Sequence, residues 1–109
     1  MRNTKRKRHS TLAKEWDSIA QTRSNQIESG QDISHSKVLL PTMVQLSSGL
    51  NFKRVLDAGC GTGSLTRLVA RKAQRIVGVD MSSKSIALAL RLSNGLGNVE
   101  YEAQTIEAF

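Results

Sequence analysis

The stretch Val55-Leu56-Asp57-Ala58-Gly59-Cys60-Gly61-Thr62-Gly63 decides the fold of this chain. An apolar pair and an acidic residue come first, and glycine then occupies every second position. Apolar residues before such a loop indicate a buried strand, and glycines let a ligand approach the main chain without meeting a Cβ atom. A helical pattern begins at Thr62 or Gly63, where the first N–H groups have no partner within the helix. The stretch therefore predicts a strand, a ligand-binding loop and the start of a helix.

A second apolar strand, Val77-Gly78-Val79, ends in the carboxylate of Asp80. A glycine loop, a helix, a strand and an acid in this order indicate half of a nucleoside-binding βαβ unit. A dinucleotide fingerprint, G-x-G-x-x-G, needs its third glycine at position 64, which is Ser64. The spacing here is D-x-G-x-G-x-G, so the sequence departs from the dinucleotide pattern.

This pattern resembles motif I of the class I S-adenosylmethionine-dependent methyltransferases, and Asp80-Met81 is similar to the second motif of that family. The resemblance covers about 53–109, and Thr105-Ile106-Glu107 is similar to a run in ubiquinone-biosynthesis O-methyltransferases. It implies an α/β fold, with strands 1–3 of a Rossmann-like parallel sheet preceded by two N-terminal helices. It also implies S-adenosylmethionine as the cofactor and methyl transfer to a small molecule or RNA.

The resemblance gives roles to individual residues. Gly59 and Gly61 would touch the methionine portion and the ribose, while Asp57 would shape the loop and receive the amino group through water. Asp80 would accept both ribose hydroxyls. The candidate cofactor-binding residues are Asp57, Gly59, Cys60, Gly61, Gly63, Asp80, Met81, Thr105 and Ile106.

At the adenine end, Met81 would lie against the ring and the N–H of Ile106 would bond it. Thr105 stands where the family commonly has an acid, which weakens this part of the resemblance. Each candidate also has a purely structural interpretation. The glycines would form a tight turn, Asp80 would cap the helix beginning near Ser82, Met81 would pack in the core, and Thr105 would be an ordinary turn residue.

Cys60 is the only cysteine, which excludes an internal disulfide, and its place in the loop favours packing over a nucleophilic role. His9 and His35 are far apart in the sequence, so no metal site is predicted. No catalytic residue is named, because the acceptor's general base in this family usually comes from segments after strand 4.

Two helices are expected before the glycine loop. The first covers 11–27, with an apolar stripe of Leu12, Trp16, Ile19 and Ala20. We expect Trp16 in the core, and a ligand contact is the alternative. The second covers 35–48, with Val38, Leu39, Met43 and Leu46 facing inward. Pro41 predicts that this helix begins late or is kinked. Lys37 is a candidate partner for the carboxylate of the cofactor.

From position 53 onward the pattern alternates between strands and helices. We expect strands at 54–57, 75–79 and 99–102, and helices at 62–72 and 82–94. On the first of these helices, Leu65, Leu68 and Val69 should face the sheet, and Arg67, Arg71 and Lys72 should point outward.

The net charge of +7 comes mostly from one segment. Residues 1–10 carry five basic side chains and no acid, and the remaining 99 residues carry +2. This segment is interpreted as a disordered basic tail. It would be a solvated leader without a specific role, would bind RNA through its run from Arg2 to Arg8, or would serve as a nuclear address. The helical segment 11–52 and the cofactor-binding part 53–109 follow. No secretion signal and no apolar run of about 18 residues is present, so a cytoplasmic protein without membrane contact is expected.

Strands 4 to 7 of the family are missing from this sequence, which suggests a truncated domain. The edge of strand 1 would then lack a neighbour, and an open edge favours self-association. The alternative is that the helices expected at 11–27 and 35–48, or another chain, cover this edge. A non-catalytic module that binds S-adenosylmethionine or another protein is the alternative to an enzyme.

Overall fold

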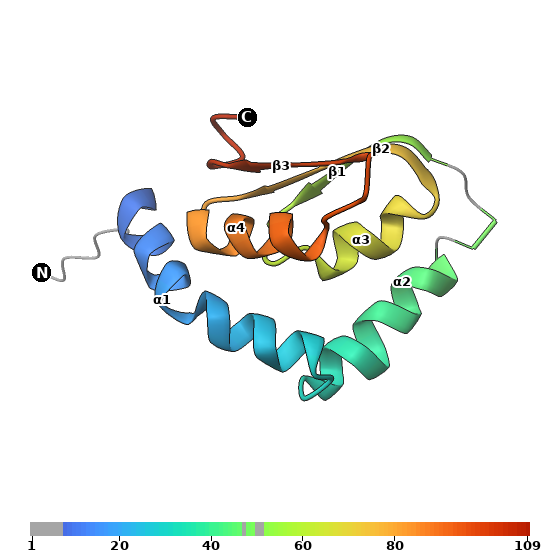
Figure 1. Ribbon diagram of the computed structural model, residues 1–109, viewed down its shortest axis with the longest axis horizontal. Helices are drawn as coiled ribbons and strands as arrows, with labels where there is room; N and C mark the ends of the chain where they lie inside the picture. Colours follow the sequence, from blue (N-terminus) through green and yellow to red (C-terminus); the bar gives the residue numbers. More distant parts are fainter. Residues whose placement is uncertain (1–7, 47, 50–51) are drawn as a thin grey trace, which may run out of the picture.

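The computed structural model describes residues 8–46, 48–49 and 52–109. Helix α1 (His9–Glu28), a π-helical segment η1 (Ser34–Leu39) and helix α2 (Leu40–Leu46) come first. They are followed by strand β1 (Phe52–Ala58), helix α3 (Ser64–Ala70), strand β2 (Ala73–Asp80), helix α4 (Ser83–Leu92) and strand β3 (Val99–Ala103). The predicted α/β order is therefore confirmed, with two helices before three strands (Figure 1).

The strands form one parallel sheet in the order β1-β2-β3. Leu56 pairs with Val77, and Gly78 pairs with Tyr101, so the carboxyl ends of β1 and β2 lie together. Parallel neighbours need crossover connections, and α3 and α4 supply them. The glycine loop follows the end of β1 and Asp80 is the last residue of β2, so they meet at one edge of the sheet.

Helices α3 and α4 cover one face of the sheet, and α1 and α2 form a further layer beneath them (Figure 1). The core lies between the sheet and these helices, where Ile76, Ile86 and Ala89 are buried. The polar side chains of Thr66 and Ser82 are also fully buried there, and both are hydrogen-bonded. Burial of hydroxyls is tolerated because each has a partner.

The first helix differs from its prediction. Ala20 is buried as expected, but Trp16 is 50% exposed and Ile19 is 43% exposed. The expectation that Trp16 belongs to the core is wrong, because α1 packs mainly against α4 and lies beside the carboxyl ends of the strands. Its apolar stripe is therefore divided between α4 and an open cleft.

The second helical segment is also less buried than predicted. Val38, Leu39 and Leu46 are exposed, and only Met43 is half-buried. The chain stays helical through Pro41, and the wider π-helical segment ends at Leu39, two residues before it. Proline lacks an N–H donor and crowds the preceding turn, which accounts for the irregularity at this point.

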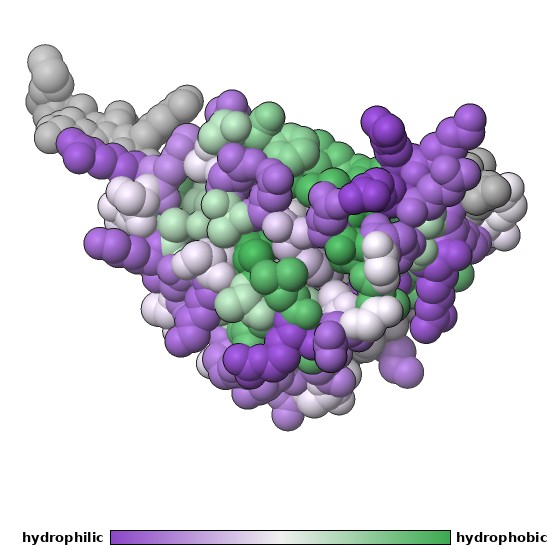
Figure 2. Space-filling view, turned by 45° about the horizontal axis from the view of Figure 1, so that its top comes forward, coloured by the Kyte–Doolittle hydropathy of each residue, from purple (hydrophilic) through white to green (hydrophobic). Residues whose placement is uncertain are grey.

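The other face of the sheet is not covered by any helix of the described residues. Asp57 bonds Thr66 of α3, so its neighbours Leu56 and Ala58 project from the opposite face, where Leu56 is 47% exposed. Apolar and charged side chains mix on the surface that Figure 2 brings forward. Among the described residues, β1 pairs only with β2, so its outer edge is open.

Two sequence predictions concern other segments. The predicted basic tail, 1–10, lies outside the described residues up to position 7. Arg8 precedes α1, and His9 and Ser10 already belong to this helix, so the prediction of a disordered tail is wrong for these two residues. No helix within the described ranges is long and apolar enough to cross a membrane.

Candidate functional site

A cleft of about 690 Å³ opens at the carboxyl ends of β1 and β2, between the glycine loop and α1. Ligands of open α/β sheets bind at this end of the strands. The volume lies within the range of small-molecule and cofactor sites, about 300–1,000 Å³. All of the candidate cofactor-binding residues line the cleft except Gly63.

The glycine loop is anchored to β2 through its main chain. The N–H groups of Gly59 and Cys60 both donate to the carbonyl of Val79, at 2.7 and 3.0 Å. Gly59 and Gly61 have φ values of +72° and +57°, which favour glycine. A Cβ atom at either position would find no atom within 4 Å. The bare backbone thus faces open space in the cleft, as close approach by a ligand requires.

Gly63 has a different reason to be glycine. Its φ is +85°, and a Cβ there would lie 2.4 Å from the Oη of Tyr101 on β3. Tyr101 was not singled out from the sequence, and it is held in place by a 2.7 Å hydrogen bond between its hydroxyl and Ser93. The third glycine therefore lets α3 begin close to the sheet, and it does not reach the cleft.

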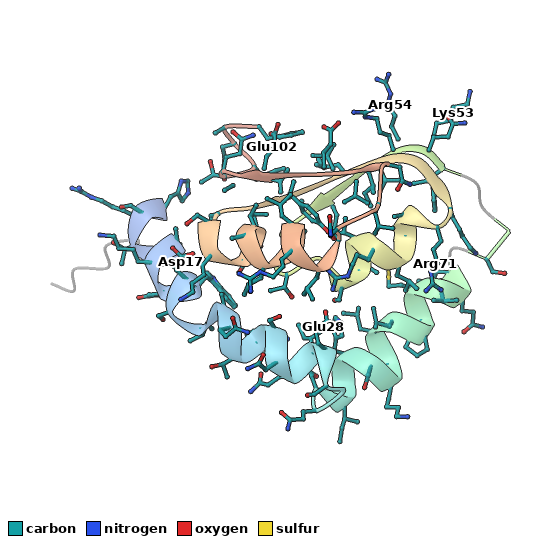
Figure 3. All side chains as sticks on the ribbon, in the orientation of Figure 1. Asp17, Glu28, Lys53, Arg54, Arg71 and Glu102 are labelled. Atoms are coloured by element: carbon teal, nitrogen blue, oxygen red, sulfur yellow. The ribbon has the colours of Figure 1, made fainter. Side chains whose placement is uncertain are left out.

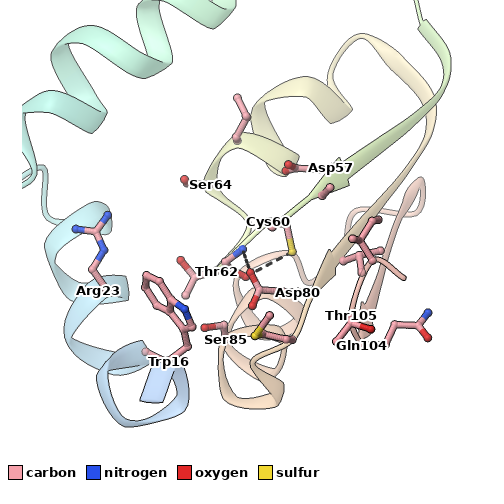
Figure 4. Close-up of a pocket in the computed structure, with 18 of the residues that line it drawn as sticks. Trp16, Arg23, Asp57, Cys60, Thr62, Ser64, Asp80, Ser85, Gln104 and Thr105 are labelled. Carbon is pink, nitrogen blue, oxygen red and sulfur yellow. Dashed lines mark hydrogen bonds between the residues drawn. The ribbon is translucent and has the colours of Figure 1, made fainter. Parts of the chain in front are cut away.

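Asp80 connects the loop to the start of α4. One carboxylate oxygen accepts the N–H of Gly61 at 2.9 Å (Figure 4). The other accepts the N–H of Ser82 at 2.9 Å. Two carboxylate oxygens offer about four acceptor sites, so about two remain for a diol. The N-cap of α4 is Ser82, whose hydroxyl accepts the N–H of Ser85, so the alternative of Asp80 as the N-cap is wrong.

Asp57 and Cys60 lie beneath the loop in a poorly solvated place. Burial raises the pKa of the Asp57 carboxyl, against the hydrogen bond that it accepts from Thr66 at 2.6 Å. Burial, with the nearby carboxylates of Asp57 and Asp80, raises the pKa of the Cys60 thiol to about 12. A thiol with this pKa is protonated at neutral pH and is a poor nucleophile, which favours the packing interpretation.

The adenine end of the predicted site lies across the cleft from α1. Met81, Thr105 and Ile106 line it together with Gln104 and Glu107, which the sequence reasoning had not selected. The N–H of Gln104 donates to the carbonyl of Asp80 at 3.0 Å, which fixes this turn beside the end of β2.

The N-terminal wall of the cleft contains residues that the sequence did not indicate. Arg23 lines it and bonds Asp32 at 2.8 Å through Nη1, while Lys37 is exposed and outside the lining. His35 Nε2 lies 2.8 Å from the hydroxyl of Ser64. Figure 4 shows Trp16 on α1 pointing toward the loop, with Arg23 on the same helix.

Thr62, within the glycine loop, was also not singled out from the sequence. Its side chain is buried at the cleft, and its hydroxyl has no hydrogen-bond partner among the described residues. A buried polar atom without a partner is uncommon and suggests a missing ligand or water. No group of three or more potential metal ligands occurs in the described part of the chain.

The nearby residue Arg67 corrects a further prediction. It was expected to point outward, but its side chain is only 18% exposed. It donates to the carbonyl of Thr62 at 2.7 Å and to Glu28 at 2.5 Å. A partly buried guanidinium is tolerated here because two acceptors satisfy it.

Comparison with known proteins agrees with this geometry. The profile of the family described as "Methyltransferase domain" matches residues 51–109. The ubiquinone biosynthesis O-methyltransferase of Pasteurella multocida is 39% identical over 72 residues, which are 64% of this chain and 29% of that protein. The enzyme of the same name from Sinorhizobium fredii is 45% identical over 56 residues, 50% of this chain and 23% of that protein. The chain thus spans less than a third of the length of these relatives.

Solved structures share the architecture. Magnesium protoporphyrin IX methyltransferase from Synechocystis, solved with S-adenosylmethionine bound, superposes with a TM-score of 0.73 at 19% identity, covering 99% of this chain and 59% of that one. The YcgJ protein of Bacillus gives a TM-score of 0.58 at 26% identity over 64% of this chain and 31% of that one. The family match, the parallel sheet and the glycine loop lead to one conclusion: the chain belongs to the class I S-adenosylmethionine-dependent methyltransferases.

Proposed function

We propose that this chain binds S-adenosylmethionine in the cleft and forms the cofactor-binding part of a methyltransferase. The observation that carries the proposal is the open backbone at Gly59 and Gly61, beside a carboxylate at the end of β2. The unpartnered hydroxyl of Thr62 supplies a further polar group at the same place.

Each part of the cleft suits one part of the cofactor. Asp80 has acceptor sites for the ribose hydroxyls, and Met81 and Ile106 offer apolar contact to the adenine. Arg23 uses Nη1 for its contacts with Asp32 and Gln26, which leaves the Nε and Nη2 donors of its fork to meet a carboxylate. We therefore assign to Arg23 the contact with the cofactor carboxylate for which Lys37 was a candidate.

The residues of this chain bind and orient; none of them is assigned a proton transfer. When bound, the cofactor supplies a methyl group already activated on a sulfonium, so the protein chiefly has to hold the two reactants together. The names of the relatives favour a hydroxyl group on a small molecule as the acceptor. An RNA acceptor would depend on the basic tail.

Calorimetric titration of the chain with S-adenosylmethionine and, separately, with NAD tests the cofactor assignment. We expect binding of the first ligand only, and a loss of about tenfold or more in affinity for Asp80→Ala, because hydrogen bonds to a charged acceptor contribute about 1.5–3 kcal/mol. Glu100→Gln, which changes an exposed acid on β3, is the matched control. Equal affinities of Asp80→Ala and the native chain would refute the assignment.

A second assay separates binding from transfer. Incubation with radiolabelled S-adenosylmethionine and a panel of small molecules that carry hydroxyl groups should label an acceptor if the chain alone is an enzyme. Binding without any transfer would favour the alternative, a cofactor-binding module without activity of its own.

A further inference from the structure

Two acidic residues of α1 are connected to the glycine loop, one from each half of the helix. Asp17 lies beside the start of α4, and Glu28, the last residue of α1, lies below α3 (Figure 3). The cleft-lining residues Trp16, Arg23 and Ile27 lie along the same helix. The connections of Asp17 and Glu28 therefore hold α1, the helix that forms this wall of the cleft, in place beside the loop.

The first connection passes through the N-cap of α4. Asp17 Oδ1 accepts the hydroxyl of Ser82 at 2.5 Å and the N–H of Lys84 at 3.0 Å. Ser82 is fully buried, and its own N–H donates to Asp80, which accepts the N–H of Gly61. Four residues from four segments thus form one hydrogen-bonded chain that ends in the loop.

The second connection reaches the other side of the loop. Glu28 bonds Arg67 Nη2 at 2.5 Å, and Arg67 Nη1 donates to the carbonyl of Thr62 at 2.7 Å. Arg67 is one turn into α3 and also lies close to Gly63, where a Cβ would be 3.0 Å from Nη1. A salt bridge between two helices is therefore transmitted to the main chain of the loop.

We infer that Asp17 and Glu28 are positioning residues for the glycine loop. They hold Asp80 and the carbonyl of Thr62 from opposite sides and so keep the loop's N–H groups in the arrangement that receives the cofactor. A site that is ordered before binding loses less entropy when the ligand arrives, and this raises affinity. The consequence for affinity rests on the proposed function; the consequence for the loop does not.

The test uses Asp17→Ala, Glu28→Gln and the double variant, with Glu100→Gln as the control. Glu100 pairs with Arg75 on the sheet, so the control also breaks one exposed acid–arginine pair, but it has no connection to the loop. The affinity for S-adenosylhomocysteine is measured by calorimetry, and amide hydrogen exchange of residues 59–63 is measured without ligand. Thermal melts identify any variant that fails to fold.

Each single variant should weaken ligand binding by roughly two- to fivefold, the effect of losing an exposed charge interaction, and should speed amide exchange in the loop. Asp17→Asn retains an acceptor for the hydroxyl of Ser82, so this variant should have a ligand affinity and a rate of loop amide exchange between those of Asp17→Ala and the native chain. The control should leave affinity and exchange unchanged.

The outcomes separate the two proposals. Loop exchange and affinity equal to those of the control in both variants would overturn the positioning role. Faster loop exchange in a chain that binds no cofactor at all would support the positioning role and refute the proposed function.

Discussion

Substitution of Gly63 by alanine should destabilise the fold much more than the same substitution at Gly95. Both glycines have left-handed φ values, +85° and +91°. At Gly95 an added Cβ meets nothing within 4 Å, whereas at Gly63 it lies 2.4 Å from the Oη of Tyr101 and 3.1 Å from its Cζ. The pair therefore separates the strain of the backbone from the clash.

The magnitude follows from these two terms. A left-handed conformation costs an ordinary residue about 1–2 kcal/mol, and this term is common to both sites. Overpacking adds about 1–3 kcal/mol at Gly63 alone. Tyr101 cannot move away freely, because its hydroxyl is bonded to Ser93 at 2.7 Å. We expect a loss of about 1–2 kcal/mol for Gly95→Ala and about 2–5 kcal/mol for Gly63→Ala.

Urea unfolding, followed by circular dichroism, measures both free energies. The same measurement in a Tyr101→Phe background tests the cause, because that change removes the oxygen that the new Cβ would meet. Gly63→Ala should then cost less than in the native chain, while the cost of Gly95→Ala should stay the same. Equal losses at the two glycines, or an unchanged loss at Gly63 without the tyrosine hydroxyl, would refute the reasoning.

Three other predictions concern titration and association. Because burial raises the pKa of the Cys60 thiol to about 12, iodoacetamide should modify this thiol far more slowly at pH 8 in the folded chain than in the unfolded chain. Equal rates of modification in buffers with and without urea would contradict this prediction. Burial raises the pKa of the Asp57 carboxyl, so the contribution of this residue to stability is present in acid and is lost as the pH rises. Asp57→Asn should therefore raise the free energy of unfolding at pH 7, and this gain should disappear below the usual pKa range of a carboxyl. A gain in unfolding free energy that increased in acid would contradict the prediction. The open edge of β1 should pair with β1 of a second copy of the chain. If the two strands pair antiparallel about their middle residue, Lys53 of each copy lies opposite Asp57 of the other, and such opposite charges favour pairing. Sedimentation velocity should show dimers that Leu56→Lys weakens, and a monomer at all concentrations in the native chain would exclude this contact.

The βαβαβ part of the fold was predictable because its signals are local. Strands at 54–57, 75–79 and 99–102 were expected and were found as slightly longer β1, β2 and β3. Glycines at the loop and after α4 mark where helices begin and end, since a positive φ restricts these positions to glycine whatever the surroundings. Patterns of this kind fix element order without knowledge of tertiary contacts.

The contacts of the N-terminal helices were not predictable in the same way. An apolar stripe shows that a helix packs on something, but not on what, and Trp16 consequently lies at the cleft instead of in the core. The pairs Arg67–Glu28 and Ser64–His35 join residues 39 and 29 positions apart. Spacing in one sequence carries no signal for such contacts, so the N-terminal wall of the cleft became visible only in the structure.

The position of the third glycine now has a physical explanation. In dinucleotide-binding loops the last glycine permits close packing of the helix and the strand, and it stands one residue later. Here Gly63 performs that task against Tyr101, which leaves position 64 free to carry a side chain. The hydroxyl of Ser64 lies within hydrogen-bond distance of His35 Nε2, and this contact holds the N-terminal segment against the cleft as its second wall. A shift of one residue in the glycine pattern therefore changes which segment the loop can recruit, and with it the shape of the site that the cofactor meets.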